Sequence, residues 1–349
     1  MADQLELLIG TEDGLVSQSS KDGGASWTDP EMLMPGTEAH ALRAGPNGTV
    51  FLGTRGKGLF RGSGDLRRWE PLDTPPAALR ARSLCWVGAR LFVGTEAGES
   101  NDPPVAVFSW SERAGWKPMG EITRCPGSGA WFYPAPHEEV HVRWLAVDPH
   151  RAGRLYAAVQ VGGVGISPDE GRTWYDKRNL DVDTHMVEPS PGHPGVVFAG
   201  AGGGFFRSND YGESWVQLAE EAGPFVVQFA LDPSESDVVY LGTARGHVMD
   251  WPKPPKAQGE LFRSEDGGDS WKKLGGGLPE RMESRINVMY VDPVAPEHVF
   301  MGGGLPSGAR NPGIAADAGV YHSPDRGATW HKIFSLDKGE PLAVCCVHR

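Results

Sequence analysis

The segment from His137 to His141 reads H-E-E-V-H and matches the pattern H-E-x-x-H. In that pattern two histidines bind zinc from one helix face and the glutamate acts as a general base. Here Pro134 and Pro136 precede the segment and a predicted β-strand follows it, so a helical zinc-protease site is not favoured. We expect Glu138 to serve instead as a general base or as an added metal ligand.

Four histidines lie in separate parts of the chain and could converge on one pocket. They are His40, His141, His185 and His247. Converging imidazoles suit zinc, copper, iron or nickel, and with carboxylates also manganese. The pattern is therefore compatible with one bound divalent transition metal. The alternative is that hydrogen bonds satisfy each imidazole separately.

A second set of residues is suited to an anionic small molecule, because guanidinium groups make forked contacts with carboxylate and phosphate. The expected ligand-binding residues are His40, Arg82, Arg143, Arg245, Arg285, Asn287, Trp131, Tyr133 and Trp251. The three aromatic residues stand in long loops and are expected to be exposed beside His and Arg. The alternative is a lid that packs its own aromatic side chains.

A repeated segment shows which elements must position these residues. The pattern S-x-D-x-G-x-[ST]-W occurs five times, at residues 20–27, 167–174, 208–215, 264–271 and 323–330. Weaker copies occupy residues 63–69 and 111–116. A short apolar strand that ends in Gly or Ala precedes each copy, and x-Asp-Pro lies upstream of several, with Val187-Glu188-Pro189 as a variant. Each unit therefore contains four short strands.

Seven four-stranded units with a period of about 42 residues predict an all-β, seven-bladed β-propeller. The chain starts at the second strand of a unit and ends with a lone strand, residues 342–347. We expect this strand to complete the first blade and to close the ring, which removes exposed sheet edges. Residues 1–349 would then form one propeller domain.

The repeats resemble the Asp-box (BNR) repeats of sialidase-like, glycosyl-hydrolase-like propellers, over essentially the whole chain. The resemblance implies that the box is a turn whose Asp accepts backbone N–H groups and whose Trp packs between strands. Sialidases, which have six blades, use an arginine triad and a Tyr nucleophile, for which Arg82, Arg143, Arg285 and Tyr133 are the candidates here. Their N-terminal Arg-Ile-Pro segment is absent. Xyloglucan-cleaving relatives join two propellers, and other single propellers resemble assembly factors that bind proteins.

The first strand of each blade is expected to line the propeller axis. We align these strands on their last residue, which is the residue before Asp-Pro or its equivalent. Four positions before it stand His40, Arg82, Arg143, Asp183, Val227 and Asn287, and six positions before it stand Glu38, Arg80, His141, Asp181, Phe225 and Arg285. Two residues before the end the side chains are apolar except at His185. Buried polar groups are costly unless water or a ligand satisfies them. We therefore expect a wet axial pocket, on the face where spacing places every long loop. The alternative is a water-filled channel without a ligand.

Composition limits the partners. The 349 residues carry a formal charge of −12, with 33 Lys and Arg against 45 Asp and Glu, which argues against broad binding to nucleic acid or acidic membranes. The N-terminus lacks a signal-peptide pattern, and the four cysteines lack metal spacing, so we expect a cytoplasmic protein with free thiols.

The favoured hypothesis is a small-molecule enzyme, a hydrolase or lyase, with or without a metal. In it, His141, His185, Glu138 and Asp183 are the catalytic groups, and the arginines hold an anionic substrate. The first alternative is a non-catalytic propeller that binds a ligand or a protein. The second is a sialidase-like glycoside hydrolase. Substrate identity and oligomeric state stay open.

Overall fold

The Gly-rich, aromatic-rich repeats form short antiparallel strands, and the chain folds as a seven-bladed β-propeller of four-stranded sheets. The computed structural model describes residues 4–99, 102–132, 140–177, 180, 183–245, 248–307 and 313–349. The chain divides into two compact units, one of His40–Gln217 and one of Met1–Ala39 with Leu218–Arg349.

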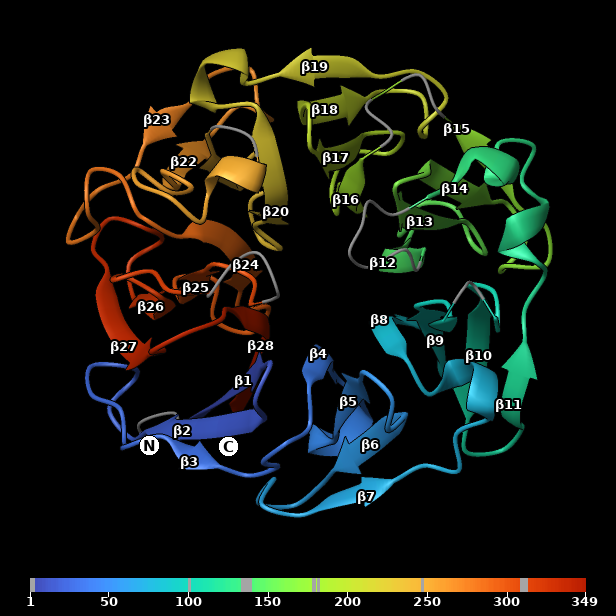
Figure 1. Ribbon diagram of the computed structural model, residues 1–349, viewed down its shortest axis with the longest axis horizontal. Helices are drawn as coiled ribbons and strands as arrows, with labels where there is room; N and C mark the ends of the chain where they lie inside the picture. Colours follow the sequence, from blue (N-terminus) through green and yellow to red (C-terminus); the bar gives the residue numbers. More distant parts are fainter. Residues whose placement is uncertain are drawn as a thin grey trace. The chain divides into compact units, whose positions relative to one another are not determined.

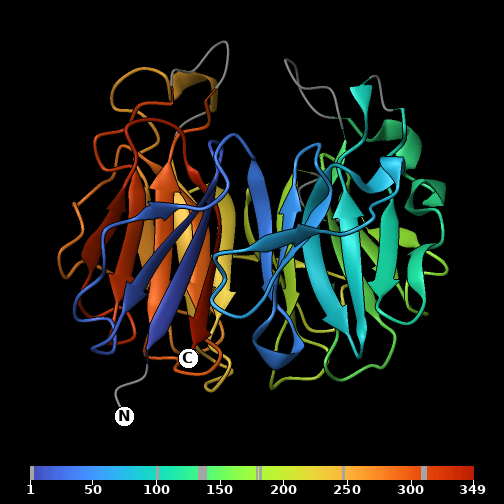
Figure 2. The same ribbon diagram turned by 90° about the horizontal axis from the view of Figure 1, so that it is seen from below.

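The unit His40–Gln217 holds four sheets, which follow one another from blue to yellow in Figure 1. The first contains β4 (Ala39–Ala44), β5 (Val50–Thr54), β6 (Leu59–Gly62) and β7 (Trp69–Pro71), and the second contains β8 (Ala81–Val87), β9 (Arg90–Thr95), β10 (Val107–Ser111) and β11 (Gly115–Pro118). The third contains β12 (His141–Val147), β13 (Leu155–Gln160), β14 (Gly163–Ser167) and β15 (Tyr175–Lys177), and the fourth contains β16 (Thr184–Pro189), β17 (Val197–Ala201), β18 (Gly204–Ser208) and β19 (Val216–Leu218). Figure 2 shows the cyan strands β8–β11 side by side, running in alternating directions.

The other unit holds three sheets. The first contains β20 (Phe225–Leu231), β21 (Val239–Ala244), β22 (Glu260–Ser264) and β23 (Lys272–Lys273), and the second contains β24 (Arg285–Val291), β25 (Val299–Gly304), β26 (Gly319–Ser323) and β27 (His331–Ser335). The third combines strands from both ends of the chain, in the order β28 (Pro341–His348), β1 (Leu5–Thr11), β2 (Leu15–Ser20) and β3 (Glu31–Met32). In the last sheet β28 pairs with β1, from Leu5 opposite His348 to Gly10 opposite Ala343. The predicted completion of the first blade by the C-terminal strand is confirmed.

Helical structure in the described residues is limited to short 3-10 turns. These are η1 (Pro46–Gly48), η2 (Pro76–Ala78), η4 (Ile122–Arg124), η5 (Ser128–Ala130), η6 (Glu220–Ala222) and η7 (Val248–Asp250). None of these turns has the length or the apolar character that crossing a bilayer requires.

The core lies between neighbouring sheets, which is why the second strand of each sheet is apolar on both faces. All six residues of β13 are buried, and in its unit Phe92, Val142 and Val159 pack into one cluster with Trp174 of the repeat. The four cysteines are also buried and none is in a disulfide. Burial raises the pKa of Cys85 and of Cys125 to about 12, which makes these thiols unreactive.

The five intact repeats form one turn geometry, which we call the repeat turn. In the turn at residues 323–330, Asp325 Oδ1 accepts the Thr329 N–H at 2.8 Å and Oδ2 accepts the Thr329 hydroxyl at 2.7 Å. The Trp330 indole donates to the Gly327 carbonyl at 3.0 Å, and Gly327 has a φ of 86°. The same carboxylate bonds recur at Asp22, Asp169, Asp210 and Asp266. These aspartates are structural, as predicted.

The long connections also lie where the spacing predicts them. Residues 119–140 separate β11 from β12, residues 245–259 separate β21 from β22, and residues 305–318 separate β25 from β26. In each antiparallel sheet the second-to-third connection leaves from the end at which the first strand starts. The long connections of a sheet and the first residues of its first strand are therefore neighbours.

Candidate functional site

Four of the first strands carry a one-residue β-bulge at the same place, and this irregularity positions the predicted site residues. The pairing with the second strand shifts between Ala81 and Ser83, between Val142 and Trp144, between Thr184 and Met186, and between Ile286 and Val288. The residues skipped by these ladders are Arg82, Arg143, His185 and Asn287, which we call the bulge row. A bulge leaves its extra residue unpaired and redirects its side chain.

The bulge row corrects the predicted alignment of the strand β16. Glu188 lies opposite Phe198 and Pro189 opposite Val197, just as Ala146 lies opposite Tyr156 and Val147 opposite Leu155 in the preceding sheet. Val187-Glu188-Pro189 is therefore not the counterpart of x-Asp-Pro, and Ser190 takes the place of the aspartate. In the corrected alignment His185 is equivalent to Arg82 and Arg143 in the bulge row, and Asp183 is equivalent to His141, two residues earlier on its strand. His185 is no longer an exception among apolar residues.

The predicted residues divide between the two units. In the unit His40–Gln217, Glu96 is the centre of one group of contacts, just beyond β9. Arg55 Nε donates to Glu96 Oε1 at 2.9 Å, Arg80 donates to the same oxygen, and Arg82 Nη1 lies 4.0 Å from Oε2. Arg82 also bonds the imidazole of His40. Only 5% of the Glu96 side chain is exposed.

The charges around Glu96 decide its protonation state. Burial by itself raises the pKa of this carboxyl, but Arg82, Arg55, Arg80 and His141 together hold the pKa at about 2. Glu96 is therefore ionised at neutral pH and can accept hydrogen bonds but not donate them. His141 adjoins it directly, because the backbones of Glu96 and His141 form a β-bridge.

Gln160, the last residue of β13, links a second group of contacts. Its Oε1 accepts from Arg143 Nη1 at 2.9 Å and lies 3.0 Å from His141 Nε2, while its Nε2 donates to Asp183 Oδ1 at 3.2 Å. The same Asp183 oxygen lies 3.2 Å from His185 Nε2. One amide thus holds an arginine, an imidazole and a carboxylate in fixed positions.

The members of this second group differ in exposure. The Asp183 side chain is 31% exposed, whereas the His185 side chain is 1% exposed. Burial raises the pKa of Asp183, but His185, Arg143 and the Gln160 bond outweigh burial and lower it to about 2. Asp183 therefore presents an ionised carboxylate towards solvent and orients an imidazole behind it.

We call these residues the polar cluster: His40, Arg55, Arg80, Arg82, Glu96, His141, Arg143, Gln160, Asp183 and His185. The named residues include four arginines and two carboxylates, a formal excess of two positive charges while the imidazoles are neutral. This contrasts with the chain's net charge of −12. The arrangement can bind an anion, and it holds imidazoles within reach of carboxylates.

In the other unit the predicted arginines form ion pairs with carboxylates of the same unit. Arg285 Nε donates to Glu340 Oε2 at 2.8 Å, Arg245 Nε donates to Glu260 Oε2 at 2.6 Å, and Asn287 Nδ2 donates to the Pro341 carbonyl at 2.7 Å. Each side chain is satisfied by its own unit. Their role in ligand binding stays a prediction.

The predicted aromatic residues are less accessible than expected. Trp251 is fully buried, packs edge-on against Phe225 and donates its indole N–H to the Arg245 carbonyl at 3.0 Å, so the expectation of an exposed side chain is wrong for it. Trp131 is half-buried against the apolar cluster of its unit. The small turns η5 and η7 bring both rings inward. Tyr133, Glu138 and His247 lie outside the described residues.

The predicted metal ligands are distributed differently from the expectation. Among the described residues, no three ligand atoms of His40, His141, His185 and the nearby carboxylates lie within 4.8 Å of one another. His40 is bonded to Arg82, His141 contacts Gln160 and His185 contacts Asp183. Because His247 and Glu138 are not described, the predicted metal stays a prediction.

Sequence reasoning missed Arg55, Glu96 and Gln160. A usable signal exists: all three stand two residues beyond the Gly or Ala that ends the strand-two pattern, at Gly53, Gly94 and Ala158. The equivalent residue of the first blade is Glu12, which accepts the Ser307 N–H at 3.1 Å. That position faces the start of a neighbouring first strand, so a charged or amide residue there is a signal for the site.

Comparison with known proteins agrees with the fold. No family model matches the chain. A xyloglucanase from Paenibacillus sp. is 32% identical over 146 residues, which are 38% of this chain and 13% of that protein. A GH74 enzyme of Niastella koreensis has a TM-score of 0.63 at 15% identity, over 85% of this chain and 45% of that one. YCF48 bound to a D1 peptide has a TM-score of 0.52 at 15% identity, over 85% of this chain and 84% of that one.

The chain thus spans less than half the length of the GH74 enzyme, and its aligned part covers a small share of the xyloglucanase. At these identities the structural likeness concerns the fold. The chain is a seven-bladed β-propeller whose fold is similar to the propellers of GH74 enzymes.

Proposed function

We propose that the polar cluster is a binding site for a small anionic molecule, with sugar acids as the class to test first. The observation that carries the proposal is the grouping of Arg55, Arg80, Arg82 and Arg143 on three neighbouring sheets around Glu96 and Gln160, where these arginines outnumber the two carboxylates that the described part of the cluster holds. Guanidinium groups recognise a carboxylate through two parallel hydrogen bonds. The similarity to a xyloglucanase supports a saccharide as the ligand, and the excess positive charge supports an acidic one.

The arginines of this site are positioned before a ligand arrives. Arg82 is held between His40 and Glu96, and Arg143 is held by Gln160. The side chains of Arg55, Arg80 and Arg82 are 27%, 26% and 18% exposed, so each is only partly covered by the protein. Pre-positioning reduces the entropy that a ligand would otherwise lose from ordering these chains.

The test is calorimetric titration of the full chain with glucuronate and with glucose, which differ in the carboxylate. We expect binding of glucuronate, no binding of glucose, and weakening of glucuronate binding by raised salt. Arg143→Gln and Arg82→Gln should each weaken binding at least about tenfold, equivalent to 1.4 kcal/mol. Arg124→Gln is the matched control, since its side chain is 77% exposed and pairs with Glu121.

Equal affinity for glucose and glucuronate, or equal losses in Arg124→Gln and Arg143→Gln, would contradict the proposal. Other carboxylates, such as citrate, measured in the same way decide whether the sugar ring contributes. Binding of citrate as tightly as glucuronate would leave the anion site in place and remove the saccharide from the proposal.

A second candidate is glycoside hydrolysis, which the xyloglucanase similarity favours. Hydrolysis needs a proton donor beside the scissile bond. Glu96 and Asp183 are both ionised at neutral pH, so neither can donate the proton. The imidazole of His185, which contacts Asp183, would have to donate it. Release of reducing sugar from xyloglucan, abolished by His185→Gln and unaffected by Arg124→Gln, is the expected result for an enzyme.

A further inference from the structure

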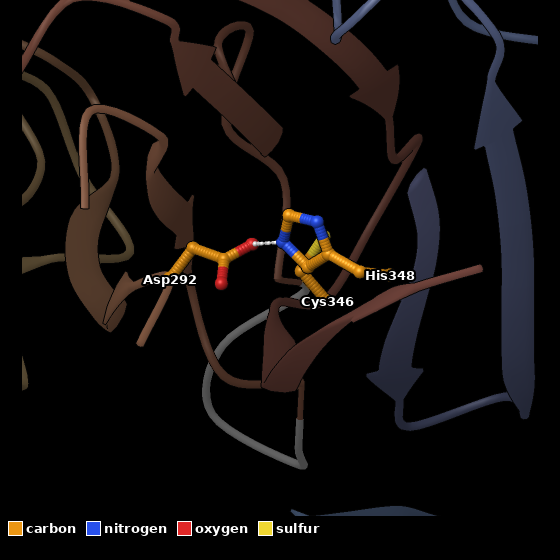
Figure 3. A group of neighbouring side chains, drawn as sticks. All are labelled: Asp292, Cys346 and His348. Atoms are coloured by element: carbon orange, nitrogen blue, oxygen red, sulfur yellow. Dashed lines mark hydrogen bonds and ion pairs between the residues drawn. The ribbon is translucent and has the colours of Figure 1, made fainter. Parts of the chain in front are cut away.

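Three side chains of metal-ligating type meet at the end of β24 and on β28, both in the unit that contains the two chain ends. Asp292 directly follows β24, and Cys346 and His348 stand two residues apart on β28, where they share a strand face. One ligand atom from each lies within 4.8 Å of the other two. Figure 3 shows the three side chains together, with the interaction between the Asp292 carboxylate and the His348 ring as a dashed line.

The trio is enclosed but has an opening. Asp292 is 0% exposed and Cys346 5% exposed, whereas the His348 side chain keeps 17% of its surface in solvent. Asp292 Oδ1 accepts the Val294 N–H at 2.9 Å, and Oδ2 accepts from His348 Nε2 at 2.7 Å. The backbone bond fixes the carboxylate, as outer contacts do for metal ligands.

The same aspartate occurs in other blades without such neighbours. Asp148 Oδ1 accepts the His150 N–H at 2.8 Å, and its Oδ2 accepts from the Tyr156 hydroxyl at 3.1 Å. Asp232 Oδ1 accepts the Ser234 N–H at 2.9 Å, and its Oδ2 pairs with an arginine, Arg326. In these two blades the aspartate stabilises the turn through Oδ1, and a tyrosine or an arginine satisfies Oδ2. At Asp292 the partners are an imidazole and a thiol instead.

We propose that Asp292, Cys346 and His348 form a three-ligand zinc site. Oxygen, sulfur and nitrogen donors together match the ligand preferences of Zn²⁺ and exclude Mg²⁺ and Ca²⁺, which take oxygen. Zn–O and Zn–N bonds of about 2.0 to 2.2 Å place tetrahedral ligand atoms about 3.3 Å apart. The His348–Asp292 contact would open by about 0.6 Å, and water would fill the fourth position.

Binding exchanges a proton for the metal. The Cys346 thiol releases its proton to solvent and binds as thiolate. In the neutral ring of His348 the proton on Nε2, which is donated to Asp292, is exchanged through solvent for one on Nδ1, so that Nε2 is free to bind the ion and the ring releases no net proton. One proton, that of the thiol, is released overall. Burial together with the nearby Asp292 raises the pKa of Cys346 well above its usual value, so zinc must offset that cost and affinity should rise with pH.

Such a site would join two sheets of one unit. Asp292 belongs to the sheet β24–β27, and Cys346 and His348 belong to the strand that completes the sheet of β1–β3. The ion would stabilise the attachment of β28, which depends on pairing with β1. This role is independent of the polar cluster and of its ligand.

The test is titration of the metal-stripped full chain with Zn²⁺ and with Co²⁺. We expect one Zn²⁺ per chain, a rise in Tm on binding, and a thiolate-to-cobalt charge-transfer band in the near ultraviolet. Cys346→Ser should abolish the band, and His348→Gln should weaken Zn²⁺ binding at least about a hundredfold. Cys345→Ser is the control, because its buried thiol is adjacent in sequence but outside the trio.

A second measurement tests the proposal without the Cys346→Ser chain, in case that variant does not fold. Zn²⁺ should protect Cys346 from alkylation in the unaltered chain, as mapped by mass spectrometry, and should lose that effect in His348→Gln, whose partly exposed side chain tolerates replacement. Absence of stoichiometric Zn²⁺ binding would overturn the proposal. So would binding that persists unchanged in both the Cys346→Ser and the His348→Gln chains.

Discussion

The repeat turns and the polar cluster both contain carboxylates whose pKa is held at about 2, yet for different reasons. Asp22 owes its low pKa to Ser26 and Ser20, bonds that form within one turn. Glu96 is buried, which raises its pKa, and arginines from beyond β5 and around β8 reverse that effect. The first arrangement recurs with the same bonds in all five turns. The second recurs with different partners at Asp183, where His185 and Arg143 oppose burial, and at Glu260, where Lys273 and Arg245 do so. Repetition of identical bonds marks the scaffold, whereas the carboxylates of Glu96, Asp183 and Glu260 are each held by their own set of partners.

The strongest way to sharpen this contrast is Glu96→Gln. The substitution removes the charge that three arginines share and leaves them facing a neutral amide in a largely buried place. We expect a loss of about 3 to 5 kcal/mol in the free energy of unfolding, measured by urea denaturation. Glu70→Gln, at a side chain 70% exposed, should change little. A loss at Glu96 no larger than at Glu70 would show that the cluster is loosely held.

Acid titration should remove the same contribution. The folded pKa of Glu96, about 2, lies below the usual 4.5, so its stabilising effect is complete above pH 4.5 and is lost as the pH falls towards 2. The quantity to compare is the difference in unfolding free energy between the unaltered chain and Glu96→Gln. This difference should be about 3 kcal/mol larger at pH 5 than at pH 2. Denaturation series at several pH values measure this difference. A difference that is constant with pH would contradict the assignment.

A smaller effect is expected from Gln160→Met, which keeps the side chain's length and removes its polar atoms. His141, Arg143 and Asp183 each lose one contact, for a cost of about 2 kcal/mol in unfolding free energy. Combined with Arg143→Met the two costs should not add, because the residues share a hydrogen bond. Strict additivity in that double-mutant cycle would argue against a linked cluster.

The smallest effect is expected in a repeat turn. Asp325→Asn keeps one acceptor oxygen for the Thr329 N–H and loses the charge, at a cost of about 1 kcal/mol. Asp210→Asn should cost a similar amount, because its turn makes the same bonds. Thermal denaturation of both variants checks this. Widely different costs would break the view that the turns are interchangeable scaffold.

The fold could be predicted from the sequence because each blade repeats its own local signals. A serine, an aspartate and a tryptophan at fixed offsets determine a turn through contacts within eight residues, and the apolar second strand follows from burial on both faces. The pairing of β28 with β1 was also predictable, since one strand was missing at one end and spare at the other.

The site was harder to predict, because its contacts join residues from different sheets. Arg82 and Arg143 were correctly placed on first strands, but Glu188-Pro189 imitated an Asp-Pro end and shifted His185 and Asp183 by two positions. Arg55 and Glu96 directly follow second strands and Gln160 ends one, and the apolar pattern of these strands carries no signal for the polar residue beyond it. Trp251 was expected to be exposed, and no sequence pattern shows that η7 returns its ring to the core.

The bulge in the four first strands β8, β12, β16 and β24 has a consequence for how such a protein can change. It offers one residue in each of these blades that the ladder of hydrogen bonds skips, so Arg82, Arg143, His185 and Asn287 differ in chemistry while the sheets around them keep the same pairing. The backbone pairing therefore does not restrict which side chain stands at these positions; the hydrogen bonds of each side chain do. New ligand preferences in this architecture would arise as recombined side chains on an unchanged frame.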